Sequence, residues 1–409
     1  MRNASVWSYG LPVYLPSVLF GAGQGAIIPV IPFSVRELGG SVAVAGLVVA
    51  VMGLGRLAGT LPAGRLVVRV GERRAMLLAA GVATGALGIC VAAPNVPVLA
   101  VGVGVVGATA AVFGLARHAY LTEVVPFELR ARALATLGGV ARIGVFAGPF
   151  LGAAAMGLVG TDGAYWVHVG AALLAGAALL MLPDITRGGP SRRAPFTRAG
   201  LPDETPPEVA RPATTLAIIR EHLPVLRTLG LGVLVISAVR ASRQAVIPLW
   251  AEHIGLDPAT ASVIFGISGG VDMLLFYPAG WVMDRFGRRW AVLPCLAVLG
   301  VSHLLIPLAG TAAALIAVAA LMGIGNGIGS GIVMTMGSDA SPSTDRAVFL
   351  GAWRLLGDAG SSAGPLMLGG IAAVAGLGIA SVSIGVLAAA GTLAMAAWLR
   401  DPQFSRCSP

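Results

Sequence analysis

The chain has 409 residues, of which 56% are hydrophobic and 11% are charged, and its mean hydropathy is +0.87. A soluble domain carries about 25% charged residues, so this composition excludes a water-soluble globular protein and predicts a chain surrounded by lipid. The formal net charge is +9, all 27 basic residues are arginines, and the three cysteines have neither disulfide nor metal-binding spacing. We therefore expect no metal site and no cofactor.

Twelve apolar runs follow one another along the chain, each of about 20 residues, the length that crosses a bilayer as a helix. They predict transmembrane helices near residues 11–33, 42–63, 75–94, 96–117, 133–158, 164–182, 226–250, 260–282, 290–309, 312–336, 349–374 and 377–399. One long polar gap, 183–224, is rich in proline and arginine and predicts a cytoplasmic linker. The expected fold is all-α and membrane-integral, with six-helix bundles at 1–182 and 225–400 and a cytoplasmic tail at 401–409.

Arginines are unevenly distributed between the loops on the two sides of this predicted bundle. The loops after the even-numbered spans carry most of them, whereas the opposite loops carry Arg36 alone. Cytoplasmic loops are enriched in arginine, so we expect a protein of the cell membrane with both termini in the cytoplasm. This anchoring role accounts for the positive charge. We therefore expect no nucleic-acid partner, and we expect a monomer.

Many residues recur at a constant offset of 216 along the chain. The recurring pairs include prolines, glycines, arginines and acids: Pro62 and Pro278, Arg69 and Arg285, Glu123 and Asp339, Pro149 and Pro365. One register that holds over almost the whole chain predicts two copies of a single six-helix unit. The two bundles are therefore expected to be pseudo-symmetric.

The loop after the second span is charged and glycine-rich in both copies. The second copy reads G-W-V-M-D-R-F-G-R-R from Gly280 to Arg289 and includes Asp284, Arg285 and Gly287. The first copy begins at Gly64, and in it Val68 occupies the place of the acid. Two six-span halves with this loop resemble the major facilitator superfamily.

This resemblance implies a secondary transporter that is not an enzyme. It also implies that the loops form a latch on the cytoplasmic side that depends on the conformational state. In the first copy the latch residues would be Gly64, Arg69 and Gly71. Glu123 and Asp339 end the fourth and tenth spans on the same side, so they are the expected acidic partners of Arg69 and Arg285 respectively. The alternative is that the arginines are topological anchors with no part in gating.

A second glycine-rich element lies in the fifth span, and its copy lies in the eleventh. It consists of Gly144, Gly148, Pro149 and Gly152, with Gly360, Gly364 and Pro365 in the copy. Glycines four residues apart form a flat face for a neighbouring helix, and proline kinks the span. The element resembles one associated with the drug and metabolite exporters of the superfamily, although such packing faces also occur in other membrane helices.

Charge inside a predicted span is costly and usually functional, and four of the charged residues there form a pattern. Arg56 recurs as Asp272 and Arg142 as Asp358, so each pair reverses its sign. The resemblance implies that span 2 packs near span 11 and span 5 near span 8. We therefore expect Arg56 to pair with Asp358, and Arg142 with Asp272. The two acids are the candidates for proton coupling, and the alternative is that the pairs are only structural.

The seventh span carries Arg240 and Arg243 on one helical face, and Arg240 recurs at the place of Gln24 in the first span. The resemblance implies that these two spans line the central cavity. We expect Gln24, Arg240 and Arg243 to face the substrate path and to favour an anionic group. The alternative is that the arginines extend toward the external end or pair with Glu252.

The expected function is secondary active transport by alternating access. The expected partners are the lipid bilayer, protons and a small-molecule substrate, with proton-driven export of a small organic or drug-like molecule. Two alternatives stay open, namely an uptake symporter for an organic anion and a transport-inactive membrane sensor. A phosphate-binding loop is missing from the sequence, which argues against transport driven by ATP.

Overall fold

The structure is a computed structural model that describes residues 6–182, 220–342 and 346–399. These residues are almost entirely helical, and none of them lies in a β-strand. Most of the predicted linker and the whole predicted tail, 401–409, lie outside the described residues. The boundaries of the two bundles, 1–182 and 225–400, stay a prediction.

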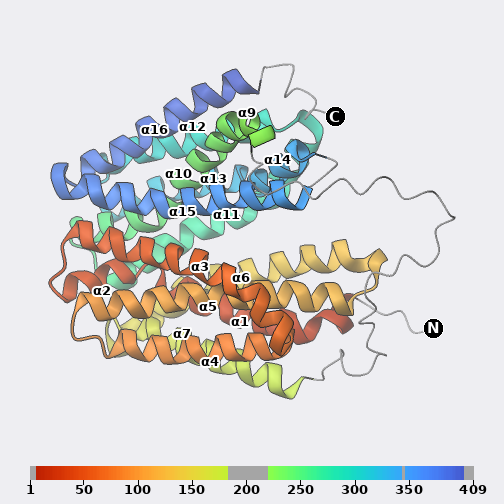
Figure 1. The fold of residues 1–409 in the computed structure, drawn as a ribbon. Coiled ribbons are helices and arrows are strands. Elements are labelled where there is room, and N and C mark those ends of the chain that lie inside the picture. Colours follow the sequence, from red (N-terminus) through yellow and green to blue (C-terminus); the bar gives the residue numbers. More distant parts are fainter. Residues whose placement is uncertain (1–5, 183–219, 343–345, 400–409) are drawn as a thin grey trace.

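The first half contains seven helices (Figure 1). They are α1 (Val6–Ile27), α2 (Ile31–Glu37), α3 (Val42–Val70), α4 (Glu72–Val91), α5 (Val96–Val124), α6 (Phe127–Val159) and α7 (Gly163–Met181). The pair α1 and α2 forms one bent crossing with an angle of 41° at its break. Pro29 lies in the break and Pro32 at the start of α2, and proline interrupts the helical hydrogen-bond ladder there.

The second half repeats this arrangement (Figure 1). Its elements are α9 (Leu223–Val225), a π-helical turn (Leu226–Gly230), α10 (Leu231–His253), α11 (Pro258–Phe286), α12 (Arg289–Leu305), a 3₁₀ turn (Ile306–Leu308), α13 (Ala312–Ile328), α14 (Ile332–Ala340), α15 (Arg346–Ala375) and α16 (Leu377–Trp398). A left-handed residue, Gly331, separates α13 from α14.

The prediction of twelve membrane-spanning helices is confirmed. Within the described residues, ten spans are long and apolar enough to cross a bilayer, and the bent pair α1–α2 makes an eleventh. The twelfth is α15, which has 30 residues and packs against α10, α16 and α3. Several helices run beyond their predicted ends, as α6 does from Phe127 rather than residue 133. Backbone hydrogen bonds of a helix are local, so polar residues continue it outside the lipid.

The 216-residue offset holds in the backbone as well as in the sequence. Three pairs of glycines with positive φ are related by it, with φ values of 78° and 78°, 85° and 89°, and 75° and 86°. The pairs are Gly39 and Gly255, Gly71 and Gly287, and Gly160 and Gly376. Each half also packs its first span against its fifth, as α1 on α6 and α10 on α15. The two halves are therefore copies of one folded unit.

The two halves meet through α3 against α15 and α6 against α11. These are spans 2 and 11 and spans 5 and 8, so the helix neighbours that the family resemblance implied are confirmed. We call the end where α3 and α11 finish, at Val70 and Phe286, the arginine end. The end that holds α2 and the α10–α11 turn is the opposite end (Figure 1).

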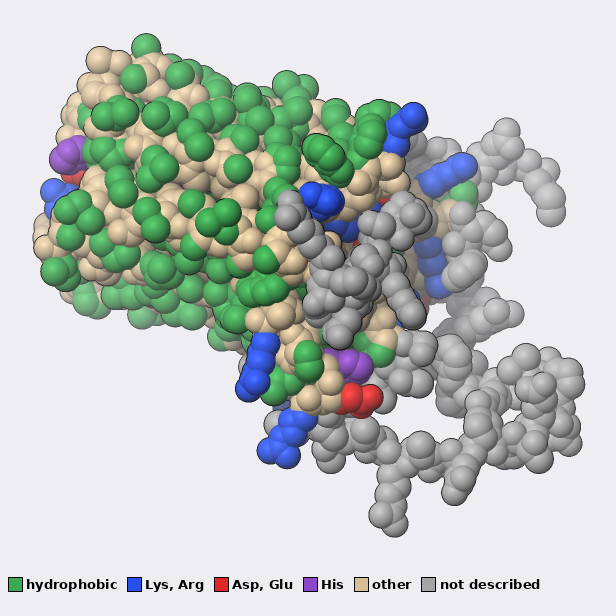
Figure 2. All heavy atoms as spheres, turned by 90° about the horizontal axis from the view of Figure 1, so that it is seen from above, with side chains coloured by type: hydrophobic (Ala, Val, Ile, Leu, Met, Phe, Trp, Pro, Cys, Tyr) green, Lys and Arg blue, Asp and Glu red, His purple; other side chains and the backbone are tan. Residues whose placement is uncertain are grey.

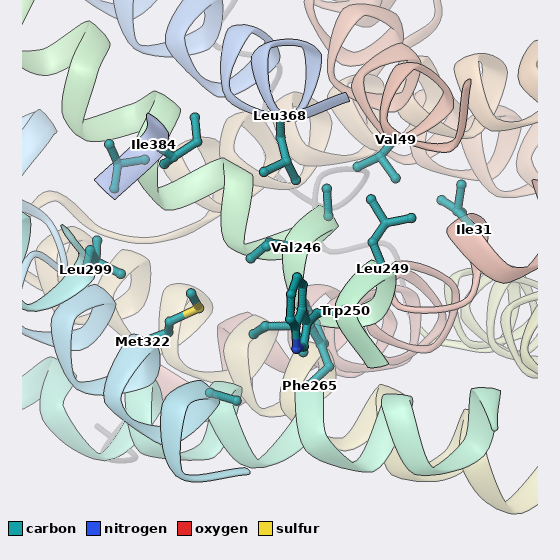
Figure 3. Packing of buried hydrophobic residues seen from close by; sticks show 14 of the residues in the cluster. Ile31, Val49, Val246, Leu249, Trp250, Phe265, Leu299, Met322, Leu368 and Ile384 are labelled. Carbon is teal, nitrogen blue, oxygen red and sulfur yellow. The ribbon is translucent and has the colours of Figure 1, made fainter. Parts of the chain in front are cut away.

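The halves are sealed together at the opposite end. One buried apolar cluster contains Ile31 and Val49 of the first half with Leu249, Trp250 and Leu368 of the second (Figure 3). An ion pair joins the same end, because Arg36 Nε of α2 lies 3.1 Å from Glu252 Oε1 of α10. A second buried cluster contains residues of the first half alone. The halves diverge toward the arginine end (Figure 1).

The flank of the bundle is apolar, as expected for a surface in contact with lipid. Figure 2 shows hydrophobic side chains over the flank, with most of the basic side chains gathered toward one end. Leu158, Tyr277 and Val374 are all more than four-fifths exposed. Water-soluble proteins rarely expose apolar surface on this scale, so the protein is a multi-pass membrane protein.

Candidate functional site

A cavity of about 660 Å³ lies between the two halves. Its walls come from α1, α3, α5 and α6 of the first half and from α10, α11, α13 and α15 of the second. Since the apolar cluster seals the opposite end, the cavity opens toward the arginine end. Its volume is within the range of sites that hold drug-sized ligands.

Charged side chains line this cavity, and most of them are cationic. The lining includes five arginines and two aspartates, so the formal excess is three positive charges. The charged residues are Arg56, Arg117, Arg142, Arg240 and Arg243, with Asp272 and Asp358. Gln24 of α1 also lines the cavity, as does Gln244 of α10. Apolar lining is supplied by phenylalanines, including Phe20 and Phe113, whose rings stack with centroids 4.2 Å apart.

A polar network in the second half holds the predicted substrate arginines. Asn326 of α13 is its centre, since it accepts a 2.7 Å hydrogen bond from Arg240 Nε and donates one of 2.7 Å to Asp272 Oδ2. Arg240 also donates to the backbone oxygen of Gly329 at 3.0 Å. Arg243 donates to Ser268 at 2.8 Å and lies 3.9 Å from Asp272 Oδ2.

Three buried polar atoms of the cavity wall have no hydrogen-bond partner in the described structure. They are the Nε atoms of Arg117 and Arg243 and the Oδ1 atom of Asp272. A buried polar group without a partner costs free energy, and it indicates a place where a ligand or water supplies the missing bond. The cavity therefore has unused donors on both halves.

The predicted pair of Arg142 and Asp272 makes no direct contact in this conformation, although the two charges attract each other. Asp272 is engaged by Asn326 and Arg243 of its own half, and it forms no ion pair with Arg142 in the described part of the chain. Arg142 instead donates to Ser330 Oγ at 2.9 Å, and its guanidinium lies 3.8 Å above the ring of Phe276. It thus crosses between the halves as predicted, but to an uncharged partner.

The predicted pair of Arg56 and Asp358 likewise makes no direct contact, although Asp358 attracts Arg56 at longer range. Both side chains line the cavity on adjacent helices, but Asp358 has its ion-pair contact with Arg354 of its own helix, at 3.8 Å. The physical reason is the separation of the halves on this side of the cavity. Arg56 is exposed to the open space between them.

The predicted latch partner of Arg285 is also wrong. Asp339 accepts a 2.8 Å hydrogen bond from Arg288 Nε, and Asp284 lies 3.3 Å from Arg288 as well. Burial disfavours the charge on Arg288, but the hydrogen bonds with Asp339 and then Asp284 outweigh it and raise the pKa of Arg288.

The turn at Gly287 accounts for this exchange of partners. It directs Arg288 toward the end of α14, whereas Arg285 on α11 lies over the ring of Trp281, 5.5 Å from its centroid. A latch between Arg69 and Glu123 in the first half stays a prediction.

The glycine element packs as its spacing predicts. A Cβ atom on Gly144 or Gly148 would lie 2.1 Å or 2.2 Å from a backbone oxygen of α1, and one on Gly152 would be 3.3 Å from Ala26. In the second half, Cβ atoms on Gly360 and Gly364 would lie 2.2 Å and 2.1 Å from backbone oxygens of α10. The element therefore brings the two cavity-lining helices of each half into close contact.

Sequence reasoning missed Asn326, Ser268 and Ser330 and left Arg117 unassigned. Asn326 was detectable as a lone amide in an otherwise apolar, glycine-rich run. Serines are common in membrane helices, where the hydroxyl can donate a hydrogen bond to a backbone carbonyl of the same helix. Ser268 and Ser330 therefore gave no such signal.

Two pseudo-symmetric six-helix bundles around a charged central cavity, sealed at one end, define a solute carrier of the membrane. The sequence model of the Major Facilitator Superfamily matches residues 13–242 and 229–406. The chain belongs to this superfamily, whose members are transporters and not enzymes.

Relatives of known sequence agree with this assignment. The chain is 30% identical over 375 residues to an uncharacterised MFS-type transporter of Mycobacterium tuberculosis, covering 85% of this chain and 82% of that protein. It is 28% identical over 139 residues to the bacillibactin exporter of Bacillus subtilis, covering 33% and 32% of the two chains.

Solved structures share the fold. The nucleoside transporter NupG has a TM-score of 0.74 at 12% identity, covering 95% of this chain and 99% of its own. A D-xylose-proton symporter has a TM-score of 0.69 at 17% identity, covering 99% and 100%. At these identities the likeness establishes the fold and leaves the substrate to be argued from the cavity.

Proposed function

We propose that the protein moves a small organic solute across the cell membrane by alternating access, as a secondary active transporter. The observation that carries this proposal is the cavity between the two repeats, sealed at one end and open at the other. By the positive-inside rule the arginine end faces the cytoplasm, so the described conformation is inward-facing. Gln24, Arg240 and Arg243 line this cavity, and they are the residues proposed to face the substrate path.

The proposed direction is export in exchange for protons. The glycine element of α6 and the partial similarity to the bacillibactin exporter support export. The carboxylates of Asp272 and Asp358 are the candidate proton carriers, since both lie in the cavity wall between the repeats. Protonation of either carboxylate would remove its attraction to the neighbouring arginines. Proton binding would in this way be coupled to the movement of the two halves.

A second candidate is uptake of an organic anion together with protons. The excess of three positive charges in the cavity favours it, because this excess suits an anionic solute whichever way it travels. The two candidates differ in the side from which the proton gradient drives accumulation.

Membrane vesicles of both orientations test the proposal. Everted and right-side-out vesicles containing the protein receive a small-molecule extract of the cell together with an imposed pH gradient. Mass spectrometry then identifies the solutes that accumulate, with ionophore-treated vesicles as the control. We expect accumulation in everted vesicles acidified inside. Accumulation in right-side-out vesicles would refute export in favour of uptake. Accumulation in neither kind of vesicle would refute transport and favour a transport-inactive sensor.

A further inference from the structure

Two cavity arginines of the first half, Arg56 on α3 and Arg117 on α5, make no direct polar contact among the described residues, although Asp358 attracts Arg56 at longer range. Neither side chain donates a hydrogen bond or forms an ion pair within the residues that the structure describes. The arginines of the second half differ, because Asn326, Asp272 and Ser268 already engage Arg240 and Arg243. Arg243 Nε of the second half also lacks a partner, but Arg56 and Arg117 are cavity arginines whose whole side chains make no direct polar contact among the described residues, and both lie on the first half.

The two side chains share one wall of one cavity. Helices α3 and α5 pack closely, since a Cβ atom on Gly107 of α5 would lie 2.1 Å from the backbone oxygen of Met52 and 3.1 Å from the backbone nitrogen of Arg56. Arg117 lies farther along α5 toward the open arginine end. A solute entering from that end meets Arg117 first and Arg56 next.

The facing wall does not neutralise them. Asp358 of α15 is the acid on that wall, and its carboxylate is 3.8 Å from Arg354 of the same helix. Asp358 also attracts Arg56, so this one acid is shared between Arg354 and Arg56, and the three arginines Arg56, Arg117 and Arg354 exceed it by two positive charges. Two uncompensated guanidinium groups at membrane depth are costly, and an anion that reaches both removes this cost.

The surroundings define the rest of the ligand. Phe20 and Phe113 stack beside this wall, and Phe113 lies one helical turn before Arg117 on α5. A planar guanidinium binds a carboxylate or phosphate through two parallel hydrogen bonds. The stacked pair is buried, and the partly exposed apolar side chains of the same cavity, Leu57 and Phe146 among them, suit an apolar body. Resting on the proposed transport function, we infer that Arg56 and Arg117 form the binding site for the anionic group of an aromatic or otherwise apolar organic acid.

Matched probe molecules test this site by binding alone. The protein in phosphatidylcholine nanodiscs is titrated calorimetrically with benzoate and phenyl phosphate, with benzamide as the neutral and benzylamine as the cationic comparator. We expect saturable binding of the two anions and none of the comparators. R56Q and R117Q should each raise the Kd for benzoate about 10- to 100-fold, the effect of losing a hydrogen bond to a charged group. R117K should retain part of the affinity, because lysine keeps the charge and loses the two-bond geometry.

The control is R65Q, which removes an exposed arginine from the same helix outside the cavity and should leave the Kd within about twofold. Size-exclusion profiles identify any variant that fails to fold. If R117Q fails to fold, R117K replaces it in the comparison. Equal binding of benzoate and benzamide, no binding of either, or unchanged affinity in folded R56Q and R117Q would overturn the inference. So would loss of benzoate binding in nanodiscs of phosphatidylglycerol, since a lipid headgroup would then occupy the site.

The binding assay needs no gradient, so its result is separate from that of the vesicle experiment. A protein that binds benzoate through Arg56 and Arg117 without moving solutes would sustain the site and refute transport. If R56Q and R117Q instead transport solutes at the rate of the original protein, transport would be sustained and the anion site refuted.

Discussion

The ion pair between Arg36 and Glu252 should control how often the opposite end opens. Its side chains are 38% and 25% exposed, and it joins α2 of the first half to α10 of the second. A solvent-accessible pair of this kind contributes about 0.3–1 kcal/mol. Glu252→Gln removes the charge and should increase the open population of this end about two- to fivefold, because the sealed state alone contains the contact.

A cysteine inside the seal measures that population. Leu249 is fully buried in the cluster of Figure 3, so in an L249C background a membrane-impermeant maleimide reacts only after this end opens. Labelling in E252Q should be two- to fivefold faster, and the charge swap R36E/E252R should restore the original rate. The matched control is E37Q, since Glu37 bonds to Thr161 within its own half at 2.5 Å. An unchanged rate in E252Q, or a swap that fails to restore it, would refute the gating role.

Three further predictions concern packing, the polar network and a helix cap. Gly148→Val should abolish folding or lower the thermal midpoint strongly, since a Cβ there meets a backbone oxygen at 2.2 Å, whereas Gly157→Ala on the same helix, with open space around it, should not. Asn326→Leu should lower the free energy of unfolding by about 1–3 kcal/mol in a denaturant titration, because Arg240 and Asp272 both lose a buried partner; an effect no larger than that of an exposed substitution would contradict it. Asp257→Ala should cost about 1 kcal/mol at neutral pH, because Asp257 caps α11. The Thr260 hydroxyl and backbone hydrogen bonds depress the pKa of Asp257, so this contribution is complete above about pH 4 and disappears as pH falls through the lowered value; a pH-independent difference would argue against the cap.

The sequence was sufficient to predict the architecture. Apolar run lengths predicted twelve crossings, and the constant offset predicted two copies that match down to the left-handed glycines Gly71 and Gly287. Run length and backbone conformation are local properties, so they can be read without knowing how helices pack. The glycine element was equally predictable, because close helix approach needs the absence of a side chain on one face.

Side-chain partners were less predictable, and the three expected pairs that make no direct contact have two causes. Arg285 and Arg288 are three residues apart, and only the turn at Gly287 decides which of them reaches Asp339. The expected pairs of Arg56 and Arg142 lie across the interface of the halves, where the distance between partners depends on which end of the cavity is open. A sequence carries the residues for every conformation of the cycle, and one structure contains the pairs of a single conformation.

The 216-residue offset also explains where the charge reversals lie. Residues on the pseudo-twofold axis meet their own copies, so like charges there would repel, and Arg36 with Glu252 is a copy pair that meets with opposite signs. Three further reversed or altered pairs line the cavity, Gln24 with Arg240, Arg56 with Asp272 and Arg142 with Asp358, whereas Val68 with Asp284 and Glu72 with Arg288 lie around the charged loops at the arginine end. Turns and packing glycines kept their symmetry because both halves need the same fold. An organic solute has no twofold symmetry, so a cavity that recognises one must lose the symmetry of its walls, and the three cavity pairs are places where those walls differ in charge or polarity.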